Sequence, residues 1–126
     1  MRIASIPKWT FADVVVANGV WGANLSRFGK WGQGETLVLL VGKEGVVVST
    51  VTGKAFTSDQ VIWENDLYEY RIPVRVENVL RGDAGAAANQ AVRKALAAGL
   101  GNIYGAYIMS QSKLPEEVEK LVKTAL

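Results

Sequence analysis

The sequence predicts an α+β fold in which a curved or barrel-like β-sheet is covered by helices. Three observations lead to this prediction. The chain has 126 residues, a common length for a domain with one core, so residues 1–126 are expected to form a single domain. Apolar residues make up 49% of the chain and charged residues only 21%, which excludes a disordered protein. Strand and helix patterns follow one another as β, α, several antiparallel β, α, β, α, without a linker or an internal repeat.

Five segments are expected to be strands: residues 3–6, 36–41, 46–51, 72–79 and 103–109. The second and third are almost continuously apolar or β-branched and are separated by a short polar, glycine-containing turn, which favours antiparallel pairing. The fourth alternates apolar and polar residues, as half-buried strands do. Pro73 in this segment predicts a sheet edge or a bulge at its own position, because proline has no N–H to donate to a neighbouring strand.

A helix is expected to begin near Thr10. Thr10 and Asp13 are three residues apart and match a capping box, in which side chains satisfy the first free N–H groups of a helix. Trp9 and Val14 have the spacing of a hydrophobic staple around that cap. The helix is expected to end at Asn18-Gly19, although the three consecutive valines before it favour a strand by propensity.

Two more helices are expected in the last third of the chain. Asp83 can cap an alanine-rich helix over residues 84–98, with Gly99 as its terminator. Pro115, followed by two glutamates, predicts the first turn of a C-terminal helix, because proline and acidic residues both favour that position.

The composition excludes most catalytic and metal chemistry. The chain has no cysteine and no histidine, so it lacks a thiolate, an imidazole and the usual zinc or iron ligands. The remaining polar residues show no spacing typical of a catalytic pair or triad. We therefore expect a protein that is not an enzyme and holds no cofactor or metal. Fourteen basic residues against twelve acidic ones are too slight an excess for strong, sequence-independent attraction to phosphates.

The compartment is expected to be the cytoplasm. No apolar run approaches the roughly 18 residues of a membrane span, and the first residues lack an apolar secretory segment. No membrane partner is expected, and the absence of cysteine agrees with a reducing environment.

Aromatic residues in glycine-containing or polar segments are the first candidates for a ligand site. Trp21 lies in the segment Asn18-Gly19-Val20-Trp21-Gly22, where the backbone can approach a ligand closely. It either lines a pocket or packs in the core. The polar stretch 52–71 also carries aromatic residues: Phe56, Trp63 and Tyr68. They either form the lip of a pocket or pin a long loop to the sheet. Arg71 either contacts a phosphate or forms an internal ion pair.

Several separated segments together resemble the EVE domain, a family of the PUA-like superfamily similar to the YTH readers of N6-methyladenine. They are the Asn-Gly-Val-Trp-Gly element at 18–22, the turn 30–35 with its strand 36–41, the strand 44–51, the segment Asp66-Leu-Tyr-Glu-Tyr-Arg-Ile-Pro-Val74, and Leu114-Pro-Glu-Glu117. The fourth is similar to the Tyr-Pro-Tyr-Arg-Val strand of archaeal members. The matches occur in the family's order and cover most of the chain.

The resemblance implies a PUA-like antiparallel or mixed barrel with an aromatic pocket, to which Trp21 and Trp63 are carried over. The expected partner is DNA or RNA carrying a modified base, such as a methylated one. Polar contacts are needed to reject the unmodified base, because burying one methyl group contributes only about 0.8 kcal/mol. The candidates for these contacts are Asn18, Asn24 and Ser49.

Three basic residues are candidates for contacts with the nucleic-acid backbone: Lys30, Arg93 and Lys94. Two alternatives remain open at this point. One is an RNA-binding module that uses this basic surface rather than a pocket, and the other is a homodimeric interaction scaffold. The domain can also act alone or with a fused or associated effector protein.

Overall fold

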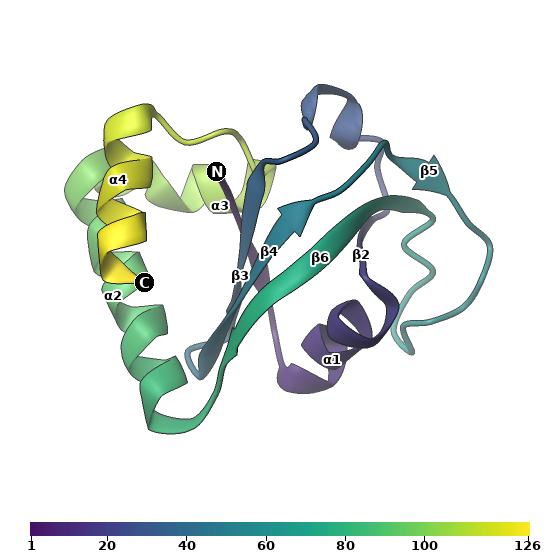
Figure 1. Ribbon diagram of the computed structural model, residues 1–126, viewed down its shortest axis with the longest axis horizontal. Helices are drawn as coiled ribbons and strands as arrows, with labels where there is room; N and C mark the ends of the chain where they lie inside the picture. The colour runs from purple at the N-terminus through teal and green to yellow at the C-terminus, as the bar shows by residue number, and fades with distance from the viewer.

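A six-stranded mixed sheet curls into a half-barrel and carries helices on both of its faces (Figure 1). The structure is a computed structural model that describes residues 1–126. Its strands are β1 (Arg2–Ile6), β2 (Val20–Ala23), β3 (Thr36–Val41), β4 (Gly45–Val51), β5 (Phe56–Thr57) and β6 (Tyr70–Leu80). The strand order is β1-β3-β4-β6-β2, with β5 paired to β6. Only β1 and β3 are parallel, so the α+β class and the curved, mixed sheet are confirmed.

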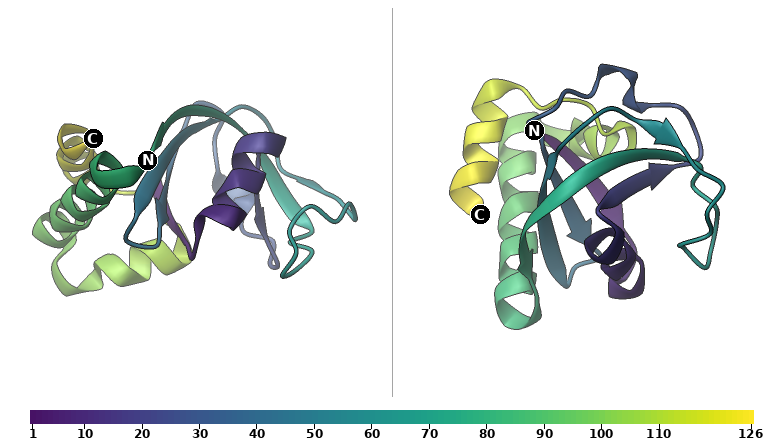
Figure 2. Two further views of the ribbon diagram at one scale, coloured as in Figure 1. Left: turned by 90° about the horizontal axis from the view of Figure 1, so that it is seen from below. Right: turned by 45° about the vertical axis from the view of Figure 1, so that its right-hand side comes forward.

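The helices are α1 (Trp9–Asn18), α2 (Gly82–Leu100), α3 (Tyr104–Ser110) and α4 (Glu116–Ala125). Two short 3-10 turns, η1 (Phe28–Lys30) and η2 (Gly101–Ile103), precede β3 and α3. Helices α2 and α4 pack together beside the sheet, whereas α1 lies within the curl near β2, as both views in Figure 2 show. The sheet is therefore covered by different helices on its two faces.

Strand β3 is apolar at every position except its first because both of its faces are buried. Leu37, Leu39 and Val41 belong to a core on the concave face, shared with α1. Val38 and Leu40 belong to a second core under α2 and α4. Side chains of a strand alternate between the two faces, so a strand covered on both sides needs apolar residues throughout.

Strand β6 changes partners along its length, and this change bends the sheet. Residues 74–80 pair with β4, whereas residues 70–73 pair with β2 and two of them also with β5. The register with β4 slips between Val48 and Ser49, opposite Glu77. Of the edge or bulge predicted at Pro73, the bulge lies at Glu77 instead, whereas Pro73 itself has a strand partner on one side only. Pro73 lies opposite Val20 of β2, where the partner of the strand changes.

Three local predictions are wrong: the strand over residues 103–109, the capping box of α1, and the cap of α2 by Asp83, which lies inside the first turn of a helix that begins at Gly82. Residues 103–109 are helical rather than a strand, because Tyr104, Tyr107 and Ile108 recur at helical spacing and pack on the second core. Helix α1 has no capping box: it begins at Trp9 without a side-chain cap, and Asp13 pairs instead with Arg81.

Glycines end helices α1 and α2, but only α1 ends at the predicted residue. Gly19 ends α1 in the left-handed conformation, at φ 64°, as predicted. Gly99 does not end α2 but lies inside it. A Cβ at Gly99 would approach Val118 of α4 to 2.8 Å, so this glycine allows the two helices to pack closely. Helix α2 ends at Gly101.

Candidate ligand pocket

A pocket of about 440 Å³ opens on the concave side of the sheet. Its wall combines the end of β1, helix α1, strand β2, the loops that follow β2 and β5, and the end of α3. The lining side chains include Phe11, Trp21, Asn24, Arg27, Trp63, Asn65, Tyr68, Met109 and Gln111. A cavity of this size, half apolar and with a few polar groups, is typical of small-molecule sites.

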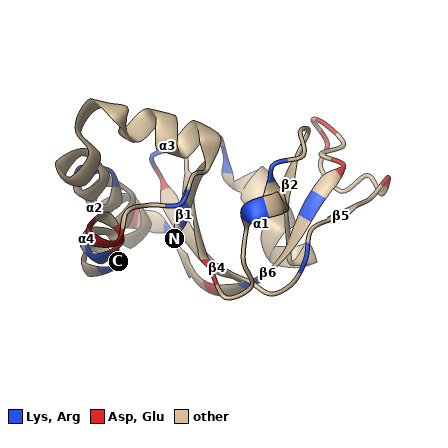
Figure 3. Cartoon of the chain, turned by 90° about the horizontal axis from the view of Figure 1, so that it is seen from above, with Lys and Arg blue, Asp and Glu red and all other residues tan.

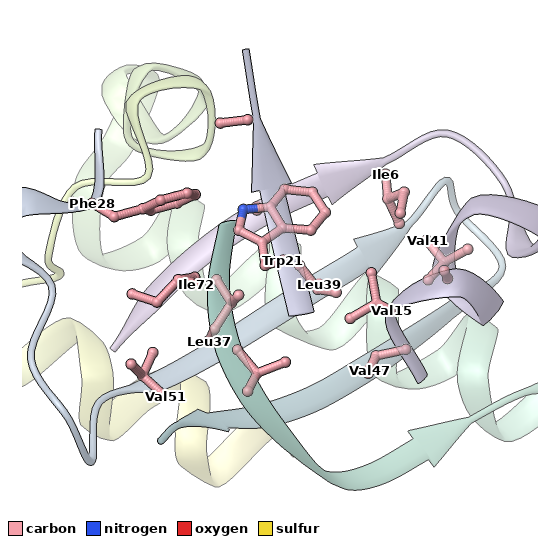
Figure 4. Close-up of a cluster of buried hydrophobic side chains, with 14 of the residues drawn as sticks. Ile6, Val15, Trp21, Phe28, Leu37, Leu39, Val41, Val47, Val51 and Ile72 are labelled. Atoms are coloured by element: carbon pink, nitrogen blue, oxygen red, sulfur yellow. The ribbon is translucent and has the colours of Figure 1, made fainter. Parts of the chain in front are cut away.

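Trp21 both packs in the core and lines this pocket. It lies on β2 opposite Ile72, and its side chain is only 8% exposed. Figure 4 shows it among the aliphatic side chains of the first core, including Leu39 and Ile72. Its Nε1 donates a hydrogen bond to Oε1 of Gln111 at 3.2 Å. The indole is therefore held rigidly and has a fixed orientation at the pocket wall.

Trp63 is the second indole of the wall and belongs to the loop between β5 and β6. Its Nε1 donates to the carbonyl oxygen of Phe11 at 3.3 Å, which ties the loop to α1. Tyr68 packs edge-to-face on it, with ring centroids 5.4 Å apart. Trp63 also packs against Gly22 of β2, where an added Cβ would lie 2.8 Å from the indole ring. The glycine after Trp21 therefore allows Trp63 to pack against the strand.

Arg71 is a structural clamp rather than a ligand contact. It is 2% exposed, and its guanidinium donates to the carbonyl oxygens of Tyr68 and Leu67, both at 3.2 Å, and to that of Gln60. It also lies over the Trp63 ring, 5.5 Å from the centroid. The predicted partners, a phosphate or a carboxylate, are replaced by three backbone carbonyls. The residue therefore holds the loop that carries Trp63 and Tyr68.

The polar groups of the pocket are partly engaged with one another. Asn24 Nδ2 donates to Asp66 Oδ2 at 2.9 Å, and Asn65 Nδ2 donates to the Tyr68 hydroxyl at 2.7 Å. Arg27 Nη1 donates to the Met109 carbonyl oxygen at 3.1 Å. Each of these bonds joins or stiffens the loops around the opening.

Besides Arg71, three more of the predicted ligand contacts do not line the pocket. Asn18 is exposed at the end of α1, where its side chain donates to the Val14 carbonyl oxygen. Ser49 is completely buried in the sheet and donates to the Leu37 carbonyl oxygen at 2.9 Å. Phe56 lies on β5 with 43% of its surface exposed. The structure thus brings together Trp21, Asn24, Trp63 and Tyr68 from the predicted set.

The three predicted backbone contacts do not line the pocket either. Lys30 is exposed in η1. Arg93 and Lys94 belong to α2, which packs against the other face of the sheet, and the Arg93 guanidinium is bonded to Asn89 and to the Gly42 carbonyl oxygen. In Figure 3 the Lys and Arg segments are spread over the molecule among acidic ones.

Sequence reasoning missed Phe11, Arg27, Met109 and Gln111. No local signal marks them: Phe11, Met109 and Gln111 reach the pocket only through the packing of α1 and α3 against the sheet, and Arg27 reaches it from the loop after β2. The most informative of them is Gln111, which is 90 residues from its hydrogen-bond partner Trp21.

The two shifted carboxyl pKa values belong to residues outside this pocket. A hydrogen bond from Arg75, and a second one from Thr50, hold the pKa of Glu77 below its ordinary value. At Glu119 burial raises the pKa, but a hydrogen bond from Lys123 and the charge of the N-terminal amine outweigh it and lower the pKa overall. The side chains contain no group of three His, Cys, Asp or Glu residues arranged to hold a metal ion.

No family model matches the chain, and no curated protein matches it. None of the helices has both the length and the apolar character needed to cross a membrane. Function is therefore inferred from the pocket.

Proposed function

We propose that this chain is a non-enzymatic binding domain of PUA-like architecture, closest to the EVE group, that holds a modified base of DNA or RNA in the pocket. The observation that carries the proposal is the convergence of Trp21, Trp63 and Tyr68 on one cavity of about 440 Å³. Three aromatic side chains from two distant parts of the chain give the site flat, apolar surfaces suited to a planar guest.

The energetics of base capture are compatible with these walls. Removing a base from its stack costs a few kcal/mol, and stacking on an aromatic side chain returns about 1–3 kcal/mol per base. Trp21 and Trp63 expose only 8% and 4% of their surface and Tyr68 is half-buried, so contacts with the three rings offset part of this cost. A buried methyl group adds only about 0.8 kcal/mol. Discrimination between modified and unmodified bases must then come from the polar groups of the wall.

The rigidity of the wall also favours a pocket. Trp21 and Trp63 each use their indole N–H in a hydrogen bond with the protein. Arg71 holds the loop that carries Trp63 through three carbonyl oxygens. A site whose side chains are held in place before binding loses less conformational entropy when the ligand enters.

The test uses a substitution that places a larger side chain in the pocket and leaves the core side chains unchanged. Trp21→Ala is unsuitable, because truncating a buried Trp costs about 3–5 kcal/mol of stability. Ser5 lines the pocket, is exposed and makes no side-chain hydrogen bond, so Ser5→Phe adds a ring to the wall. Gln90→Phe, at an exposed position of α2 outside the pocket, is the matched control.

Binding is measured by tryptophan fluorescence with short single-stranded DNA and RNA that carry one N6-methyladenine, 5-methylcytosine or 5-hydroxymethylcytosine, and with unmodified strands. At least one modified strand should bind more tightly than its unmodified counterpart. Ser5→Phe should weaken that binding by about tenfold or more, the loss of one stacked base, whereas Gln90→Phe should not. Equal binding by both variants, with strong loss in Lys30→Ala/Lys94→Ala, would instead support a basic surface.

A further inference from the structure

Gln111 is held in the pocket wall from two sides. It follows α3 in the left-handed conformation, at φ 55°, and is 9% exposed. Its carbonyl oxygen accepts a hydrogen bond from Arg2 Nη1 at 2.9 Å, and Arg2 is itself buried and paired with Glu35. A side chain with three rotatable bonds is thus anchored by a fixed backbone.

The contact with Trp21 determines which end of the Gln111 amide faces the ligand. An indole N–H can only donate, so the amide must turn its oxygen toward Trp21 Nε1, at 3.2 Å. The other end, Nε2, makes no hydrogen bond within the protein, although Gln111 lines the pocket. The amide therefore offers its two N–H groups to whatever occupies the cavity.

The other polar groups of the wall show a division between donors and acceptors. Arg27 also lines the pocket, and a guanidinium group can only donate. Asn24 and Asn65 use their NH₂ groups on Asp66 and Tyr68, which leaves their oxygens as acceptors. The Gln111 and Arg27 part of the wall is thus equipped with donors.

The geometry points to Gln111 as a specificity-determining residue: its side-chain NH₂ donates to a carbonyl oxygen or an unprotonated ring nitrogen on the edge of the bound base. This inference rests on the proposed function and adds to it the polarity of the base edge that the pocket selects. A base that turned an amino group toward Gln111 would leave buried donors unpaired on both sides. A site of this kind rejects such a ligand strongly.

The decisive variant is Gln111→Glu. A carboxylate has the same shape and still accepts from Trp21 Nε1, but it replaces the NH₂ group with a second acceptor. Ser110→Glu is the charge control, because Ser110 is exposed, precedes Gln111 and does not line the pocket. Both variants are titrated with the same modified and unmodified strands.

We expect Gln111→Glu to weaken binding of the preferred strand by at least about tenfold, the scale of one lost and one reversed buried hydrogen bond. Ser110→Glu should change it by less than about threefold, as an exposed charge does. The side-chain NH₂ signals of Gln111 in a ¹⁵N–¹H spectrum should also shift when the strand is added to the unchanged protein.

The possible results separate the two proposals. If no modified strand is preferred by the unchanged protein, the proposed function and this inference both fail. If a strand is preferred but Gln111→Glu binds it as well as Ser110→Glu does, only the role of Gln111 fails. If Gln111→Glu does not fold, Gln111→Met takes its place, since it also lacks the donor; retained binding by that variant overturns the inference.

Discussion

Replacing Gly22 with alanine should disturb the pocket through one contact. An added Cβ at this position would lie 2.8 and 2.9 Å from two ring carbons of Trp63 and 3.0 Å from Cβ of Tyr68. Ordinary contacts of a Cβ are 3.4–4 Å, so the ring must move by about half an ångström or more. Trp63 cannot do this freely, because its Nε1 is bonded to the Phe11 carbonyl oxygen and Arg71 lies against the ring.

The cost of Gly22→Ala follows from this overlap. Inserting a methyl group into a packed site typically costs about 1–3 kcal/mol. Gly22 has no positive φ, so alanine adds no backbone strain there, and the reduced freedom of the unfolded chain returns about 0.4–1 kcal/mol. The net loss is about 1–2 kcal/mol. For a chain of this length, that corresponds to a Tm lower by roughly 4–10 °C.

Gly29→Ala is the matched control, because a Cβ at Gly29 meets nothing within 4 Å and its φ is not positive. Thermal unfolding followed by circular dichroism compares the two variants under one buffer. Gly29→Ala should be neutral or slightly stabilising, whereas Gly22→Ala should unfold at the lower temperature. Equal Tm values would refute the packing of Trp63 on Gly22, and with it the position of the second indole in the wall.

Two further predictions concern the loop clamp and the acidic limit of stability. Arg71→Met should lower the free energy of unfolding by about 2–4 kcal/mol, because two or three hydrogen bonds from a buried charged group are lost. Urea unfolding measures this difference, and a change below about 0.5 kcal/mol would contradict the role of Arg71 as a clamp. The lowered pKa values of Glu77 and Glu119 mean that their contribution to stability is fully present above the ordinary value of 4.5 and is lost as the pH falls through the folded-state values. The double variant Glu77→Gln/Glu119→Gln should therefore lose less stability than the unchanged chain between pH 5 and pH 3, and parallel pH profiles would show that these carboxylates have no such role.

The fold class and most of the sheet could be predicted from the pattern of amino acids alone. The runs 36–41 and 46–51 form β3 and β4 almost as predicted, because strands buried on both faces need apolar side chains at nearly every position. The alternating segment 72–79 lies within β6, and Gly19 ends α1. These elements could be predicted because the residue types within each segment already indicate its structure.

Local patterns did not predict the structure of short segments whose residues are compatible with both a helix and a strand. Residues 103–109 are β-branched and aromatic enough for a strand, yet they form a helical turn and α3, in which Tyr104, Tyr107 and Ile108 pack partly buried against the second core. The end of α2 at Gly101 rather than Gly99 likewise depends on the contact of Gly99 with Val118 in α4. Tertiary packing overrides local propensity where the propensities differ by less than the burial free energy.

The arrangement of the pocket could not be predicted, because it depends on contacts between distant segments. The sequence pointed to Trp21 and Trp63, but whether an aromatic side chain faces a cavity or the core depends on what the curl of the sheet places beside it. Arg71 was a candidate ligand contact and proved to be a clamp, since three carbonyl oxygens of the loop surround it. Gln111 could not be predicted as a pocket residue, because the feature that marks it is a hydrogen bond to Trp21, which is 90 positions away in the sequence. Contacts between distant segments form only when the chain folds, and no local spacing records them.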